Sequence, residues 1–163
     1  VLRLFGYGSL CWNPGTPGKD ALAHPSVKSV IGRAKGYRRC WAQKSTDHRG
    51  FPHFPGIVCT LLRDSEYKEF RDLEHPTETE GLIFEVPPEL TQTCLDQLDF
   101  REKGGYARDV ITVVEDETGE THQALLYRGT PDNPAFWPRA LKDLPFAAGK
   151  NYECEHEVLY GLF

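Results

Sequence analysis

Short apolar segments separated by glycine and proline turns limit what this chain can fold into. Residues 2–5, 57–62, 80–86, 107–114 and 121–127 have the composition or alternation of β-strands. Clear helical spacing lies between them near 88–98, and further helices are expected at 136–144 and 152–162. Residues 63–79 predict a short amphipathic helix or a mobile excursion. This mixture predicts a strand-rich α+β fold.

Size and composition narrow the class of protein further. At 163 residues we expect one domain, and the net charge of −5 argues against nucleic acid as the main partner. No apolar run is long enough for a bilayer, and we expect no signal peptide. The five cysteines are scattered and form no C-x-x-C pair, which predicts reduced thiols in the cytoplasm. Because the sequence has no methionine, we expect a trimmed N-terminus.

The first apolar segment ends in a glycine-rich turn, Phe5-Gly6-Tyr7-Gly8-Ser9-Leu10-Cys11. Glycine reaches positive φ at little cost, so we expect Gly6 and Gly8 to let several backbone N–H groups converge. Converging amides make a nest for an oxyanion or a carboxylate. Ser9 would add a hydroxyl and Tyr7 an aromatic wall. A simple tight turn at a strand end is the other interpretation.

Two catalytic motifs with a similar glycine pattern do not fit this turn. The dinucleotide fingerprint needs a third glycine and a following helix, but Cys11 stands there and Pro14 and Pro17 follow. A nucleophile elbow needs glycines two positions before and after its serine, where Ser9 has Tyr7 and Cys11.

Two polar stretches follow. Residues 27–43 mix apolar and basic side chains and predict one long strand or a bent pair, kinked at Gly32 or Gly36. We interpret the basic side chains as a solvated face, with a nucleic-acid surface as the less favoured alternative. The loop at 45–50 contains Asp47 and His48, which resemble part of an acid–base pair, although a lone loop histidine is more often structural.

A helix is predicted to begin at Pro88 and to end at the glycine pair 104–105. Its apolar stripe consists of Leu90, Cys94, Leu95 and Leu98. Glu102 follows Leu98 by one helical turn, so we expect it on the inward face. A carboxylate at the inner end of an apolar stripe is a candidate acid–base residue. A surface glutamate paired with Arg101 or Lys103 is the other interpretation.

Six stretches carry a family resemblance when they are taken in order. They are 5–14, 36–39 (Gly-Tyr-Arg-Arg), 45–50 (Ser-Thr-Asp-His-Arg-Gly), 98–106 (Leu-Asp-Phe-Arg-Glu-Lys-Gly-Gly-Tyr), 130–134 (Thr-Pro-Asp-Asn-Pro) and 149–152 (Gly-Lys-Asn-Tyr). Together they resemble the ChaC-type γ-glutamylcyclotransferase family. Two segments depart from the family pattern: 63–79 is longer, which could alter a rim of the cleft, and 154–157 is inserted near the end.

The resemblance implies a fold and a reaction. The fold is a small, closed or nearly closed mixed β-barrel with flanking helices, spanning residues 1–163. The reaction converts a γ-glutamyl compound to 5-oxoproline and releases the amine; in the ChaC branch glutathione releases Cys-Gly, as part of glutathione catabolism. The expected partner is therefore this small molecule, without nucleic acid or a membrane. The oligomeric state is left open.

The implied reaction assigns roles to residues of the matching motifs. The substrate's α-amine attacks its own γ-carbonyl, so the protein must supply a base, donors for the oxyanion and a proton for the leaving amine. Glu102 is the expected proton shuttle. The expected substrate-binding residues are Gly6, Tyr7, Gly8, Ser9, Leu10, Cys11 and Tyr106. We expect no cofactor and no metal, because the sequence lacks the usual ligand spacings.

Two other functions stay open at this point. The first is a γ-glutamyl amidase that releases glutamate, with Ser9 or Cys11 as nucleophile and His48 as base. The second is a binding module that keeps the barrel and performs no chemistry. A carboxylate at Glu102 favours an enzyme, because a binding module does not need one there.

Overall fold

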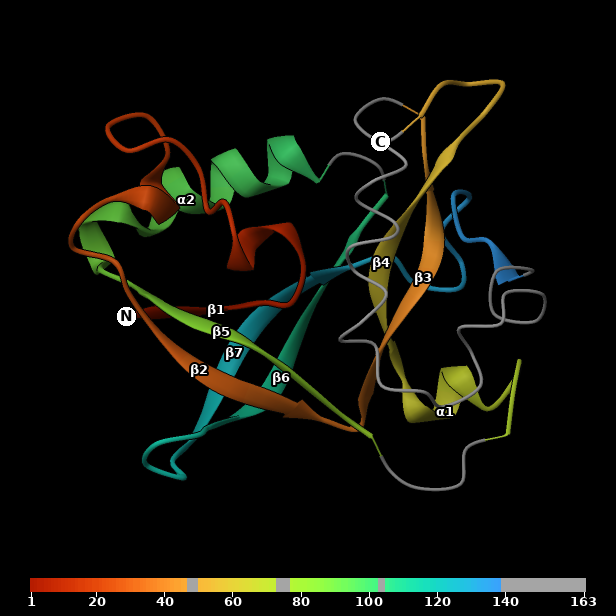
Figure 1. Cartoon of the computed structure of the whole chain (residues 1–163). Helices are drawn as coiled ribbons and strands as arrows, with labels where there is room; N and C mark the ends of the chain where they lie inside the picture. The colour runs from red at the N-terminus through yellow and green to blue at the C-terminus, as the bar shows by residue number, and fades with distance from the viewer. Residues whose placement is uncertain (47–49, 73–76, 103–104, 139–163) are drawn as a thin grey trace.

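The computed structural model describes residues 1–46, 50–72, 77–102 and 105–138. Five strands form a closed barrel in the order β1-β5-β2-β6-β7, and β3 and β4 form a separate two-stranded sheet. Figure 1 shows the barrel on one side, the β3–β4 ribbon on the other, and α2 lying along the barrel. The strands are β1 Leu2–Gly6, β2 Lys28–Lys35, β3 Tyr37–Ser45, β4 Gly56–Arg63, β5 Glu78–Val86, β6 Ala107–Glu115 and β7 Thr121–Arg128. The α-helices are α1 Asp64–Tyr67 and α2 Pro88–Arg101.

The barrel is mixed, as the resemblance implied. Strand β1 runs antiparallel to β5, with Leu2 opposite Val86, but parallel to β7, with Leu4 opposite Leu125. The other barrel pairs are antiparallel. The parallel pairing places the first strand beside the last one and closes the barrel.

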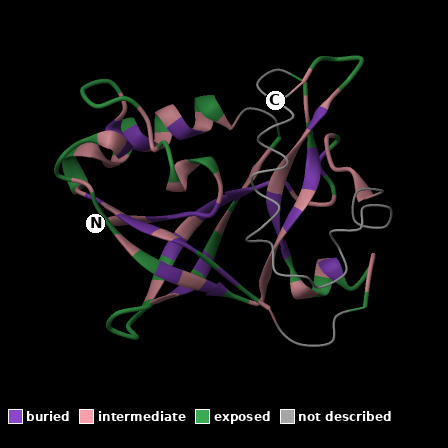
Figure 2. Cartoon of the chain, in the orientation of Figure 1, coloured by how far each residue is buried: buried purple, intermediate pink, exposed green. Residues whose placement is uncertain are grey.

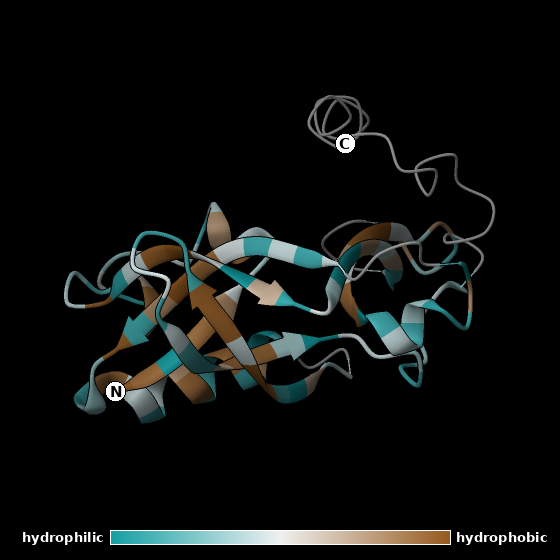
Figure 3. Cartoon of the chain, turned by 90° about the horizontal axis from the view of Figure 1, so that it is seen from below, coloured by the Kyte–Doolittle hydropathy of each residue, from teal (hydrophilic) through white to brown (hydrophobic). Residues whose placement is uncertain are grey.

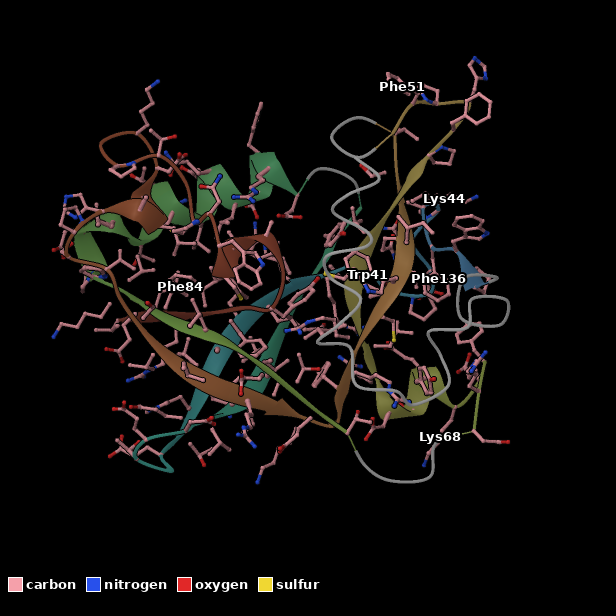
Figure 4. All side chains as sticks on the ribbon, viewed as in Figure 1. Trp41, Lys44, Phe51, Lys68, Phe84 and Phe136 are labelled. Carbon is pink, nitrogen blue, oxygen red and sulfur yellow. The ribbon has the colours of Figure 1, made fainter. Side chains whose placement is uncertain are left out.

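Apolar side chains pack on both surfaces of the barrel wall. Phe5 and Ile83 belong to a cluster shared with residues of β6 and β7. Their neighbours Leu4 and Phe84 belong to a second cluster that includes Cys94 of α2. Strand β5 is therefore apolar on both faces, as expected of a wall between a barrel interior and a packed helix. Figures 2 and 3 show the buried and apolar stretches of these strands, and Figure 4 labels Phe84 on the side of α2.

The stretch 27–43 is a bent pair of strands rather than one strand. The bend falls at Gly36, one of the two predicted positions, where φ is +76° and a residue without a Cβ is favoured. The basic side chains here have partners: Arg33 pairs with Glu78 and Asp116, and Arg38 stacks on a tyrosine ring. Such contacts favour the solvated-face interpretation over a nucleic-acid surface.

A buried arginine joins the ribbon to the barrel. Arg128, at the end of β7, is 2% exposed and donates to Asp109 of β6 at 2.6 Å and to Glu66 of α1 at 2.7 and 2.9 Å. It also donates to the backbone oxygen of Leu61 in β4 at 3.2 Å. One cation therefore connects two barrel strands, the short helix and the ribbon.

The structure tests some of the remaining sequence predictions, and others lie outside the described residues. The predicted 63–79 excursion contains α1 and the start of β5, and residues 116–120 join β6 to β7. Phe136 was predicted to begin a helix. It instead forms an isolated β-bridge with Gln43 of β3. The predicted helix at 152–162, most of the one at 136–144, and the segment 154–157 lie outside the described residues. Within the described part, no helix is long and apolar enough to cross a membrane.

Candidate active site

The glycine-rich turn leaves β1 and coils into a short 3-10 helix, Ser9–Cys11. Neither glycine takes the positive φ that the sequence predicted; Gly8 has φ −133°. Glycine is favoured here because the packing is close. A Cβ on Gly6 would lie 3.0 Å from the Phe84 ring, and one on Gly8 would lie 3.2 Å from the sulfur of Cys59. The turn is therefore pressed against β5 and β4.

Two side chains of the turn are already hydrogen-bonded. Arg101 of α2 donates to the Ser9 hydroxyl at 2.9 Å, and the Cys11 thiol donates to the backbone oxygen of Gly6 at 3.1 Å. Burial raises the pKa of the Cys11 thiol, so it stays protonated. Leu10 packs with the apolar residues beneath α2. Ser9 thus ties the turn to the end of α2, while Cys11 and Leu10 hold its shape.

Glu102 follows the last residue of α2 and caps the helix. Its amide still donates to the carbonyl of Leu98 at 2.8 Å, so the predicted one-turn relation to Leu98 is confirmed. Its side chain is 21% exposed, and its carboxylate lies 3.8 Å from the guanidinium of Arg101. Gly105 follows with φ +82°, and Asn133 donates to its carbonyl at 2.9 Å. The backbone therefore takes a left-handed conformation at Gly105, which favours glycine.

Burial and neighbouring charge shape the titration of this cluster. Burial raises the pKa of Glu102, and the nearby Arg101 cation partly opposes that rise. Burial also raises the pKa of Tyr7 and Tyr106, and the Glu102 carboxylate and Cys59 add to both rises. Two phenols that stay protonated therefore face a carboxyl group whose proton is held more tightly than usual.

The structure thus brings together most of the predicted residues. Tyr7, Glu102 and Tyr106 form one partly buried cluster beside the turn. Arg101 links Ser9 to this cluster, because it donates to the Ser9 hydroxyl and lies near the Glu102 carboxylate. Asp47 and His48 lie outside the described residues. Sequence reasoning missed Cys59, which packs under the turn. It treated Arg101 only as a surface partner of Glu102, although its position next to Glu102 was a signal.

Other candidate features lie elsewhere. A cavity of about 410 Å³ lies between α2 and the segment that follows the turn, and its lining includes Leu22, Leu98, the acidic residues Asp20 and Asp96, and Arg101. Within the described residues, one group of three side chains could hold a metal ion, and it consists of Glu115, Glu120 and His122 at the β6–β7 hairpin. It does not include Glu102.

Comparison with known proteins gives the family. A model of the ChaC-like protein family matches residues 2–148. The chain belongs to the ChaC-like protein family. The resemblance seen in the sequence motifs is therefore confirmed over nearly the whole chain.

Curated relatives of this ChaC-like chain carry names that describe an activity. The glutathione-specific γ-glutamylcyclotransferase of Schizosaccharomyces pombe is 36% identical over 143 residues, which cover 84% of this chain and 66% of that protein. The human glutathione-specific γ-glutamylcyclotransferase 1 is 35% identical over 139 residues, covering 83% of this chain and 54% of the relative. The chain therefore spans about half to two thirds of the length of these relatives.

Solved structures confirm the ChaC-like fold. A crystal structure of the yeast γ-glutamyl cyclotransferase specific to glutathione superimposes with a TM-score of 0.70 at 21% identity, covering 99% of this chain and 93% of that chain. The predicted fold, a small mixed barrel with flanking helices, is correct.

Proposed function

We propose that this chain converts glutathione to 5-oxoproline and Cys-Gly, a step of glutathione catabolism. The observation that carries the proposal is a carboxyl group at Glu102, mostly buried beside the glycine-rich turn, with its pKa raised by burial. The names of the curated relatives support glutathione as the substrate. Glu102 is the proposed catalytic residue.

The proposed reaction is an internal displacement. Glu102 takes a proton from the substrate's α-amine, whose nitrogen forms a bond to the γ-carbonyl carbon and makes a tetrahedral oxyanion. The oxyanion then collapses, the bond to the cysteine nitrogen breaks, and Glu102 returns the proton to that leaving nitrogen. Because the nucleophile is tethered to its target, holding the glutamyl chain folded supplies much of the rate.

The raised pKa of Glu102 suits both halves of this proton transfer. A carboxylate with a higher pKa is a stronger base toward the amine, and its conjugate acid can return the proton to the leaving nitrogen. Tyr7 and Tyr106 stay protonated, so each has an O–H group to offer to the oxyanion. The amides of residues 6–11 are the proposed holders of the γ-glutamyl unit.

Contacts within the turn argue against the amidase alternative. A nucleophilic hydroxyl needs a neighbouring base, but among the described residues Ser9 accepts from Arg101, whose guanidinium only donates and cannot act as one. A nucleophilic cysteine needs a thiolate, but burial raises the pKa of Cys11 and its thiol donates to Gly6. The binding-module alternative leaves the mostly buried Glu102 without a purpose.

Mass analysis of the product tests the proposal. The purified chain is incubated with glutathione, and the acyl product is identified by mass spectrometry. We expect 5-oxoproline with an equal amount of Cys-Gly. Free glutamate, which is heavier by one water, would support the amidase, and unchanged glutathione would support the binding module.

We also propose a cytoplasmic location and glutathione, rather than nucleic acid or a membrane, as the partner. Cys11, Cys40 and Cys94 are free thiols in the structure, which suits a reducing compartment. Cell fractionation with a tagged full-length protein tests the location; a membrane or secreted fraction would contradict it.

A further inference from the structure

Arg101 contacts the glycine-rich turn and also lines the cavity described above. It donates to the Ser9 hydroxyl at 2.9 Å, approaches Glu102 no closer than 3.8 Å, and lines the cavity of about 410 Å³. Its side chain is 38% exposed. Arg101 therefore faces the proposed reaction centre on one side and solvent-accessible space on the other.

The charge of Arg101 is only weakly compensated. Arg3 lies 2.9 Å from a carboxylate oxygen and Arg128 lies 2.6 Å from one, whereas the carboxylate contact of Arg101 is 3.8 Å long. A guanidinium has five N–H donors in a planar fork that matches a carboxylate. Its one hydrogen bond in the described part of the chain goes to the neutral hydroxyl of Ser9. Donors are therefore left for a ligand.

The proposed substrate carries a carboxylate that fits this cation. In glutathione the glycine carboxylate lies two residues beyond the γ-carbonyl, which is about 7 Å in an extended chain. With the γ-carbonyl at Glu102, Arg101 on the adjacent residue lies within that reach. The cavity falls within the range of roughly 300–1,000 Å³ that is usual for ligand sites, so it has room for the released dipeptide.

We propose that Arg101 binds the glycine carboxylate of glutathione, with the Cys-Gly part of the substrate extending toward the cavity between α2 and the segment after the turn. This inference rests on the proposed function and adds a specificity-determining residue to it. Arg101 selects a tripeptide with a terminal carboxylate over γ-glutamyl compounds that lack one.

Comparing two substrates with two proteins tests the inference. Glutathione and glutathione monoethyl ester, in which the glycine carboxylate is esterified, are given to the wild-type chain and to Arg101→Gln, and 5-oxoproline formation is measured. We expect the wild type to favour glutathione by about 10- to 100-fold in kcat/KM, the range for a hydrogen bond to a charged group. The preference should appear mainly in KM, because the contact is far from the reacting atoms.

Arg101→Gln should abolish this preference. We expect its kcat/KM for glutathione to fall to the value that the same variant shows for the ester. If the substitution also disturbs Ser9 or Glu102, it changes kcat/KM for both substrates by the same factor. That factor cancels in the ratio of the two kcat/KM values. Arg101→Lys should keep part of the preference, because it retains charge without the fork. The matched control is Arg108→Gln, which removes an exposed arginine paired with Asp99 and should keep the full preference.

Two outcomes would overturn the inference. One is a wild type that turns over both substrates equally well, and the other is an Arg101→Gln variant that loses the same factor on both. Calorimetric binding of the two ligands to Glu102→Gln gives the same comparison without turnover. A binding preference that depends on Arg101, in a chain that forms no 5-oxoproline, would support the inference and overturn the proposed reaction.

Discussion

At the scale of single residues, Glu102 depends on its position at the end of α2. A residue inside the helix would be fixed by its neighbours, and one in an open loop would be solvated. At the cap it is tied to Leu98 through its amide while its carboxyl group is partly buried. Burial raises its pKa, and Arg101 limits the rise. The position of Glu102 at the helix cap therefore sets both the burial of its carboxyl group and its pKa.

Replacing Glu102 by glutamine keeps its shape and removes its ability to accept a proton. We expect kcat to fall by about 10² or more, the usual scale of general-base catalysis, with an unchanged circular dichroism spectrum. Turnover near the wild-type level would mean that another group moves the proton. Glu89→Gln, at an exposed position early in α2, is a matched control that should retain full activity.

Titration of Glu102 should appear in the pH profile. Its base form is active, so kcat/KM should fall as the pH drops through a pKa above the usual 4.5 for glutamate. Arg101 lowers this pKa, so Arg101→Gln should move the acid limb to higher pH. The measurement is kcat/KM with glutathione between about pH 4 and 9. An acid limb that stays in place, or moves to lower pH, would contradict the assignment.

Ser9→Ala separates cyclisation from hydrolysis through a nucleophile. If Ser9 only shapes the turn, the backbone amides remain and activity should fall on the order of 10- to 10³-fold at most. A nucleophilic Ser9 would cost nearly all activity. Intact-mass spectra of the wild type during turnover should show no γ-glutamyl adduct; an adduct on Ser9 or Cys11 would refute the cyclisation mechanism.

Sequence reasoning reached some of these residues and missed others for physical reasons. The place of Glu102 followed from local helical periodicity, which one sequence reveals. The conformations of Gly6 and Gly8 did not, because the space at both positions is limited by neighbours on distant strands, Phe84 and Cys59. Contacts between residues far apart in sequence leave no local pattern.

At the scale of elements, the β3–β4 ribbon is held to the barrel by Arg128. Its partners Asp109 and Glu66 are only 18% and 19% exposed, so their charges need the arginine. Short apolar runs and turns predicted the strands well. They could not predict which strands close the barrel and which form the ribbon, because pairing depends on distant partners.

Arg128→Met keeps the volume of the side chain and removes its charge. We expect a loss of about 3 kcal/mol in the free energy of unfolding, since two mostly buried carboxylates lose their partner. The loss should not reach the upper end of the known range, because Asp109 keeps Arg63 at 3.0 Å. Urea denaturation measures it.

Arg3→Met is the control for this prediction. Arg3 forms a more exposed pair with Glu85, so its loss should change stability by about 0.5 kcal/mol. Equal losses of unfolding free energy in Arg128→Met and Arg3→Met would show that the buried ion pairs of Arg128 stabilise the fold no more than an exposed pair does.

At the scale of the whole molecule, the glycine-rich turn depends on close approach across the barrel wall. A Cβ on Gly81 of β5 would lie 2.3 Å from the backbone oxygen of Gly6 and 2.7 Å from the Phe5 ring. Gly81→Ala should therefore cost about 1–3 kcal/mol of unfolding free energy and raise KM, because the turn must shift. Urea denaturation and steady-state kinetics measure the two effects.

Gly119→Ala is the comparison for Gly81→Ala. Gly119 has φ +71° with nothing near its missing Cβ, so alanine there should cost about 1 kcal/mol through backbone strain alone. It should leave KM unchanged. A Gly81→Ala protein with unchanged KM would show that the turn tolerates movement of β5.

Closure of the barrel between β1 and β7 also bears on how the protein is made. Leu4 finds its parallel partner Leu125 more than a hundred positions later. During synthesis the first strand therefore leaves the ribosome long before the strand that completes its pairing, and the nascent chain must hold it unpaired on that edge. Folds dominated by such distant pairings form slowly.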